Sequence, residues 1–144
     1  MVVEKLKMED LDQVVALHAS LIPFDIAFES AEEEYQKMLE DDAYLLAAVK
    51  EGDEVLGVAT GTCCRTLSVP FLVIEDVVVK EGMRGRGIGH LLMEEMDRFA
   101  AEKNCMYSIL ISSGFRQDAH RFYENCGFVD SVRGFRKVYR AFKE

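Results

Sequence analysis

The sequence lacks several features that would assign the chain to a membrane-bound or exported class of protein. No run of about eighteen apolar residues occurs among its 144 residues, so no membrane span is predicted. The opening residues, MVVEKLKMEDLD, contain no basic segment followed by an apolar one, and no signal peptide is predicted. These absences favour a cytoplasmic protein without a membrane partner.

Cysteine and histidine are too few and too scattered to indicate a metal site. The four cysteines contain no Cys-x-x-Cys pair, and the adjacent Cys63 and Cys64 are poorly placed to bridge each other. We interpret all four as reduced thiols. The three histidines do not combine with them into a metal-ligand pattern. No histidine lies near a cysteine in the sequence, although a pair that meets only in the fold stays open.

Basic charge is also scarce, and it is unevenly distributed. The net charge of −9 argues against nucleic acid as a partner. Residues 1–80 carry a net charge of −11, whereas residues 81–144 carry +2. The N-terminal part therefore suits a cation and the C-terminal part an anion.

Apolar periodicity and turn residues predict a single α/β domain over residues 1–144. Gly52-Asp53 predicts a hairpin turn, Ser30 with Glu33 predicts a helix-capping box, and His18 falls on an apolar helix stripe as a packed or rim residue. A strand–helix–strand at the centre implies one mixed sheet. Helices are predicted at 8–20, 30–40, 88–103 and 117–125, and strands at 2–6, 44–50, 55–66, 71–79, 106–111, 128–129 and 136–142.

A glycine-rich stretch, RGRGIGH at residues 84–90, follows the most apolar strand, FLVIEDVVV at 71–79. A strand that ends in a glycine turn and opens a helix is an anion site, because free N–H groups and the helix dipole face the ligand. The spacing fits neither a P-loop nor a dinucleotide fingerprint. What remains is the pattern R-x-x-G-x-G, formed by Arg84, Gly87 and Gly89.

This pattern resembles the acetyl-CoA pyrophosphate loop of the GNAT N-acetyltransferase superfamily. A second segment, AHRFYENCGF at 119–128, is similar to that family's A-x-x-F-Y-x-x-x-G-F signature, in the expected order along the chain. The resemblance implies a mostly antiparallel mixed sheet that splays at its middle, flanked by about four helices. It also implies acetyl-CoA as co-substrate.

The resemblance assigns residues to the co-substrate by position. The gap in the splayed sheet would take the pantetheine arm along the backbone of Val77, Val78 and Val79. Arg116 stands where the family often has Asn, and it would reach a CoA phosphate instead. The residues that would wrap the pyrophosphate are Arg84, Gly85, Arg86, Gly87, Ile88, Gly89 and His90.

Acetyl transfer to an amine needs a base, because an alkyl ammonium group has a pKa of about 10.4. Glu75 interrupts an apolar strand and resembles the strand glutamate that serves as base in many family members. Asp76 and a water chain are the alternatives, and strand alternation puts Asp76 on the face opposite Glu75. Tyr123 matches the family tyrosine that protonates the leaving CoA thiolate; a core aromatic is the structural alternative.

The sequence thus predicts an N-acetyltransferase that moves an acetyl group directly from acetyl-CoA to a primary amine of a small molecule. RQDAHRFY at 116–123 is similar to aminoalkylphosphonate acetyltransferases, whose acceptor carries an anion that Arg133, Arg136 and Lys137 could hold. Protein amines and a non-catalytic acyl-CoA-binding module are further alternatives. A homodimer stays open.

Overall fold

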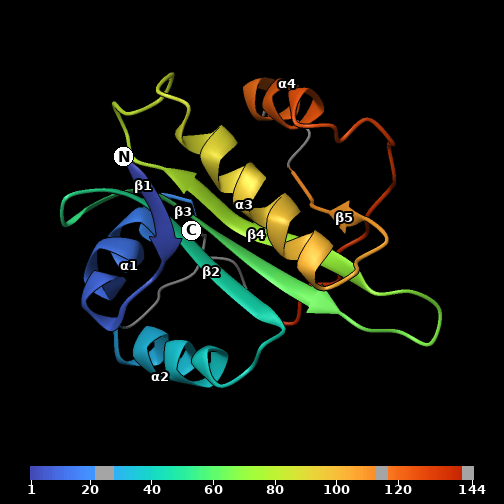
Figure 1. Ribbon diagram of the computed structural model, residues 1–144, viewed down its shortest axis with the longest axis horizontal. Helices are drawn as coiled ribbons and strands as arrows, with labels where there is room; N and C mark the ends of the chain where they lie inside the picture. The colour runs from blue at the N-terminus through green and yellow to red at the C-terminus, as the bar shows by residue number, and fades with distance from the viewer. Residues whose placement is uncertain (22–27, 113–116, 141–144) are drawn as a thin grey trace.

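The computed structural model of the chain describes residues 1–21, 28–112 and 117–140. From β1 to α4 the strands and helices follow one another in the predicted order, with one short 3-10 turn, η1, before the first helix (Figure 1). The strands are β1 Val2–Lys5, β2 Tyr44–Glu51, β3 Glu54–Cys64, β4 Phe71–Val79 and β5 Ser108–Ile109. The helical elements are η1 Met8–Asp10, α1 Leu11–Ala19, α2 Phe28–Leu39, α3 Ile88–Glu102 and α4 Gln117–Asn125.

The five strands form one sheet in sequence order, β1-β2-β3-β4-β5. The first four are antiparallel neighbours, as hairpins require, and only β4 and β5 run parallel. The β4–β5 ladder pairs just Leu72 with Ser108 and Val73 with Ile109. Beyond Val73 the strands separate, which confirms the predicted splay and leaves the second half of β4 without a neighbour on that side among the described residues.

Helices cover both faces of the sheet. α3 and α4 lie on one face, and α1 and α2 lie on the other (Figure 1). The α3 face buries the larger core, which contains Leu56, Leu72, Leu92 and Met96, all below 1 % exposed. The smaller core, on the α1 face, joins Val14 of α1, Tyr35 of α2 and Val78 of β4. The mixed α/β fold with four helices is therefore as the sequence predicts.

A buried ammonium group on β2 links this strand to β1 and η1. The Lys50 ammonium group, with the residue 4 % exposed, lies 2.7 Å from Asp10 Oδ1 and 3.1 Å from Glu4 Oε1. The second Asp10 oxygen accepts the N–H of Lys7. Burial by itself lowers the pKa of Lys50, but hydrogen bonds and the charges of both carboxylates outweigh it and raise that pKa. The buried ammonium group is thus paired with two carboxylates, which compensates for the loss of water around its charge.

Two sequence predictions about local structure are wrong. Ser30 does not cap α2, because the helix begins at Phe28 and Ser30 lies within its first turn. No strand forms within residues 128–140, where strands at 128–129 and 136–142 were expected; residues 141–142 lie outside the described residues. Most of this segment is exposed, including Val129, Phe135 and Tyr139 at 78 %, 86 % and 86 %. β5 is too short to offer it a ladder, since a strand needs a neighbour to satisfy its backbone groups.

Within the described ranges, no helix combines the length and the apolar character that crossing a membrane would demand.

Candidate functional site

The candidate site is centred on a bulge in β4. The β3–β4 register pairs Thr60 with Glu75 and Val58 with Val78, so Asp76 and Val77 together oppose one residue of β3. Asp76 has φ +55°, in the left-handed region. Aspartate visits this region more readily than most side chains, because its short polar group bonds locally. An extra residue in one strand bends it and changes the direction of its side chains.

The bulge brings both acidic side chains of β4 to one face. Before it, Leu72 and Ile74 enter the core on the α3 face, so Glu75 points to the α1 face. After it, Val78 belongs to the core on the α1 face. The alternation therefore shifts by one residue at Asp76, which lies beside Glu75 rather than opposite it. The prediction that the two carboxylates occupy opposite faces is wrong, since a regular pleat was assumed.

The surroundings of Glu75 disfavour its charged form. Glu75 is exposed to solvent, but the protein around its carboxyl desolvates it in part. This desolvation and then the neighbouring charge of Asp76 raise the pKa of the Glu75 carboxyl, while the charge of Arg136 opposes this shift. Arg136 comes from the segment after α4, which returns behind β4 (Figure 1). A carboxylate with a raised pKa is a better proton acceptor near neutral pH than an ordinary one.

Sequence reasoning missed His18, which belongs to the same face. It lies in the last turn of α1 and is half-buried, and the negative charge of Asp76 acts on its imidazole. The apolar stripe of α1 was visible in the sequence, but it indicated packing. Nothing in the sequence showed that β4 would present Asp76 to this helix.

The glycine loop has the geometry of an anion site. Gly85 and Gly87 have φ of +83° and +81°, which side chains other than glycine rarely adopt. Gly87 caps α3, whose first residue is Ile88, so the unpaired N–H groups of the first turn open toward the loop. Arg84 is exposed beside them. The expected loop and helix start are both present.

Two residues of the motif have contacts within the protein. A Cβ on Gly89 would lie 2.8 Å from Phe122 Cζ, so glycine lets α4 approach α3 there. The guanidinium of Arg86 lies 3.0 Å from Glu51 Oε2 and also contacts the Met83 sulfur. Packing and an ion pair therefore account for contacts that the sequence pattern assigned to phosphate.

Tyr123 lies on α4, in an aromatic cluster that reaches the glycine loop through Phe122 and His90. Its ring packs against Phe122 and Phe128, with centroid distances of 5.3 Å and 6.1 Å, and Phe122 packs against His90 at 5.1 Å. The loop and α4 thus meet on the α3 face, and Glu75 lies on the α1 face. The open edge of β4 at 77–79 runs between them. Arg116 lies outside the described residues.

A cysteine–histidine pair does form in space. The Cys126 sulfur lies 3.7 Å from Nδ1 of His90. Burial, and then the charge of Asp97, raise the pKa of the Cys126 thiol. The thiol therefore stays protonated at neutral pH, which makes it a poor nucleophile.

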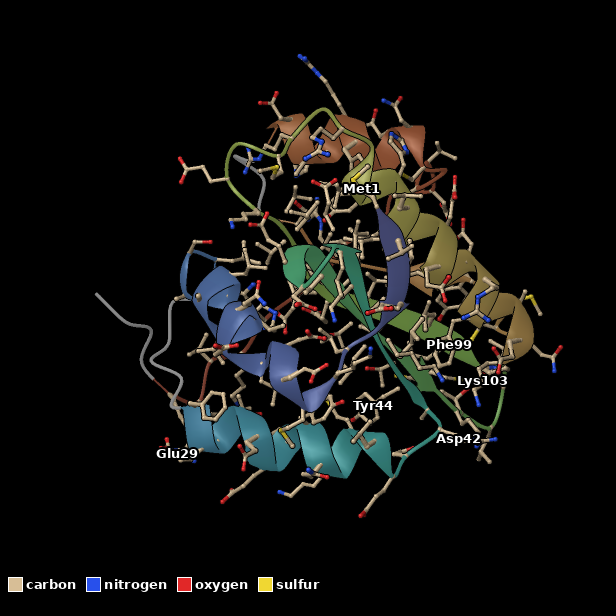
Figure 2. The ribbon with its side chains drawn as sticks, turned by 60° about the vertical axis from the view of Figure 1, so that its left-hand side comes forward. Met1, Glu29, Asp42, Tyr44, Phe99 and Lys103 are labelled. Atoms are coloured by element: carbon tan, nitrogen blue, oxygen red, sulfur yellow. The ribbon has the colours of Figure 1, made fainter. Side chains whose placement is uncertain are left out.

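A cavity of about 570 Å³ opens elsewhere, between α2 and the end of α3. Asp42 and Lys103 line it, and their side chains, labelled in Figure 2, form an ion pair of 3.4 Å. None of the predicted site residues lines this cavity. Among the residues the structure describes, no cluster of His, Cys, Asp and Glu could hold a metal ion.

Comparison with known proteins identifies the family to which this site belongs. The model of the acetyltransferase (GNAT) family matches residues 11–128, which contain the bulge, the glycine loop and α4. The chain belongs to the GNAT family.

Individual proteins with acetyltransferase names match nearly the whole chain in sequence or in fold. An aminoalkylphosphonate N-acetyltransferase of Salmonella typhimurium is 27 % identical over 139 residues, covering 90 % of this chain and 86 % of its own. A solved structure from Agrobacterium tumefaciens str. C58, assigned as an acetyltransferase, has a TM-score of 0.87 at 26 % identity and covers 96 % of this chain and 99 % of its own. Glucosamine-6-phosphate N-acetyltransferase of Arabidopsis thaliana shares the fold, with a TM-score of 0.83 at 18 % identity, over 96 % of this chain and 98 % of its own.

Proposed function

We propose that the protein transfers an acetyl group from acetyl-CoA to a primary amine of a small molecule. The observation that supports the proposal most strongly is the connection from β4 through the glycine loop to the N-terminus of α3. A strand with one open edge leads into a loop whose glycines at 85 and 87 have left-handed conformations at a helix N-terminus. Such a loop suits a pyrophosphate, and the open edge suits an extended arm that hydrogen-bonds to backbone groups.

Acetyl-CoA would lie along this path. Val77, Val78 and Val79 would offer backbone groups to the pantetheine arm, and the loop from Arg84 to His90 would surround the pyrophosphate. Arg84 is the better source of positive charge, because Arg86 is already paired with Glu51. Gly89 would serve mainly by letting α4 approach. We also place Arg116 near a CoA phosphate, and we assign the enzyme to the cytoplasm, where thiols remain reduced.

The reaction would proceed by direct transfer. Glu75 accepts a proton from the ammonium group, either directly or through water, and the neutral nitrogen attacks the thioester carbonyl carbon. The carbon–sulfur bond then breaks, and Tyr123 donates a proton to the departing thiolate. The second proton of the attached nitrogen returns through water to the Tyr123 oxygen, which leaves a neutral amide and restores the phenol. The raised pKa of Glu75 supports its role as base, with Asp76 beside it as the alternative. The protonated Cys126 thiol supports transfer without an acetyl-enzyme.

The acceptor would be an amine that also carries an anion. Two carboxylates at the bulge suit its ammonium group, and Arg136 approaches closely enough for its charge to act on Glu75. The Salmonella relative is named for an acceptor with both groups, an aminoalkylphosphonate. A simple amine, a protein amine, or a binding module without catalysis would be the alternatives.

Release of free thiol from acetyl-CoA tests these alternatives. We expect turnover with aminoalkylphosphonates, weaker turnover with matched alkylamines, and none with lysine peptides. Gly87→Glu should abolish CoA binding in calorimetry while circular dichroism shows an intact fold. Tight CoA binding without thiol release for any amine would refute catalysis, and normal CoA affinity in Gly87→Glu would refute the placement of the pyrophosphate.

A further inference from the structure

Helix α1 packs over the face of the sheet that carries Glu75. Val14 of this helix packs in the same core as Val78 of β4, two residues beyond Asp76. His18 follows Val14 by four residues, so it lies one turn further along the same face of the helix. The helix stripe and the bulge therefore bring an imidazole and the Asp76 carboxylate toward each other from two different elements.

Most charged groups on the elements around α1 are paired elsewhere, so the charge that acts on His18 comes from the bulge in β4. On η1, Asp10 is paired with Lys50. On α2, the buried Tyr35 hydroxyl donates to the carbonyl oxygen of Leu6, and the α1 side of β3 at Val55, Val58 and Thr60 carries no titratable group. On α1 itself, Asp12 lies in the first turn and accepts the N–H of Gln13.

β4 contributes Asp76 and Glu75, and Arg136 acts on Glu75 from the segment after α4. Of all these groups, within the part of the chain that the structure describes, Asp76 is the one whose charge acts on the His18 imidazole.

We propose that His18 is a specificity-determining residue of the amine site, which admits the cationic acceptor while its imidazole is neutral and repels it when protonated. The proposal rests on the acetyltransferase function proposed above. A neutral imidazole can accept a hydrogen bond from an ammonium group, whereas an imidazolium can only donate and would bind to the Asp76 carboxylate that the acceptor needs. His18 would thus make acceptor binding depend on pH in the range where histidine titrates.

The direction of titration supports this assignment. Burial lowers the pKa of His18 below its ordinary value of 6.5, and the charge of Asp76 opposes this shift. The imidazole is therefore neutral at physiological pH, when the enzyme would be working. Removal of the Asp76 charge should lower the pKa of His18 further, because only the effect of burial would remain.

Direct titration of the imidazole by NMR tests the pair independently of catalysis. His18→Gln assigns the His18 signal among the three histidines, and the parent should show it with a pKa below 6.5. Asp76→Asn should move that pKa lower still. A pKa at or above the ordinary value, or one that Asp76→Asn leaves unchanged, would overturn the pairing.

Kinetics of the acceptor then test the role itself. We would measure kcat/KM for the amine at saturating acetyl-CoA from about pH 5 to pH 8 and divide the His18→Gln profile by that of the parent, which cancels the titration of the amine. The ratio should be flat above the His18 pKa and rise toward about tenfold per pH unit below it. His120→Gln on α4 is the matched control and should give a flat ratio.

A flat ratio for His18→Gln, in an enzyme that still releases thiol, would overturn the proposal while leaving the acetyltransferase function standing. Absence of thiol release in the parent with every amine would remove both. A packing role for His18 predicts lower thermal stability with the same pH profile, so melting curves of His18→Gln separate packing from acceptor selection.

Discussion

Gly89 provides the sharpest test of how the glycine loop is built. The motif assigns it to the phosphate, whereas the structure places it against Phe122 of α4. A Cβ at position 89 would lie 2.8 Å from Phe122 Cζ and 3.0 Å from Cε1. Carbon atoms prefer separations of about 3.5–4.0 Å, so Gly89→Ala should push the ring, and α4 with it, away by roughly 0.7 Å.

The expected loss of stability follows from two opposing effects. Overpacking a contact of this kind costs about 1–3 kcal/mol, and replacing glycine by alanine in a helix returns up to about 1 kcal/mol. The net loss should be about 1–2 kcal/mol. At about 2–4 °C per kcal/mol for a chain of this size, the melting temperature should fall by about 2–8 °C.

A double-mutant cycle identifies the cause. Phe122→Leu removes the ring atoms that the new methyl group would meet, so Gly89→Ala should cost much less in that background, with a coupling of about 1 kcal/mol or more. Gly87→Ala is the matched control. Its φ of +81° makes alanine strained by about 1–2 kcal/mol, but nothing lies within 4 Å of its Cβ, so its cost should not depend on Phe122.

Urea unfolding of the parent, the three single variants and the two double variants gives every free energy in the cycle. Equal coupling to Phe122 at positions 87 and 89, or additivity within about 0.5 kcal/mol at position 89, would refute the packing explanation.

Three further predictions concern the buried charge and the two proposed catalytic groups. Lys50→Met leaves the buried Asp10 carboxylate without its cationic partner and should lower the free energy of unfolding in urea by about 3–5 kcal/mol. As a control, Lys80→Met breaks the exposed pair with Glu54 and should lower it by less than about 1 kcal/mol. Equal losses in the two variants would contradict this account. Tyr123→Phe should lower kcat by roughly 10²–10⁴-fold with little change in acetyl-CoA affinity; an unchanged kcat under conditions where chemistry limits the rate would assign Tyr123 to packing alone.

Glu75→Gln should raise the melting temperature at neutral pH and leave it unchanged at acid pH, because the raised pKa means that folding favours the protonated form and loses that contribution as pH rises through the folded pKa. Its rate deficit should shrink at high pH, where the amine loses its proton unaided. A lower melting temperature at neutral pH would instead identify Glu75 as the partner in a structural ion pair.

The sheet and the four helices could be predicted because the sequence is locally consistent with them. Gly52-Asp53 between two apolar runs specified the β2–β3 hairpin, and β4 lies at its predicted bounds, Phe71–Val79. α4 also has its predicted bounds, because Gly127, with φ +98°, follows its last turn. These features depend on residues that are close in the sequence, so one sequence is enough to predict them.

The bulge at Asp76 could not be predicted, and it determines the composition of the site. Nothing within FLVIEDVVV marks where the ladder with β3 gains a residue, since no glycine signals the left-handed position. The error about the face of Asp76 followed from this, and so did the omission of His18. Contacts such as Gly89 with Phe122 depend on how two helices meet, which the spacing of a motif does not report.

The β4–β5 ladder is short, so the parts of the molecule on its two sides should differ in the free energy needed to unfold them locally. β1 to β4 are joined by ladders of four to eight residue pairs, while two pairs join β5 to this body. Amide hydrogen exchange should therefore be slowest in β2 and β3, and β5 with α4 should open as a separate cooperative unit at lower free energy. The proposed acetyl-CoA path runs between these two parts, so bound acetyl-CoA would contact both and hold them together. Binding should therefore slow amide exchange most in β5 and α4 rather than in the core.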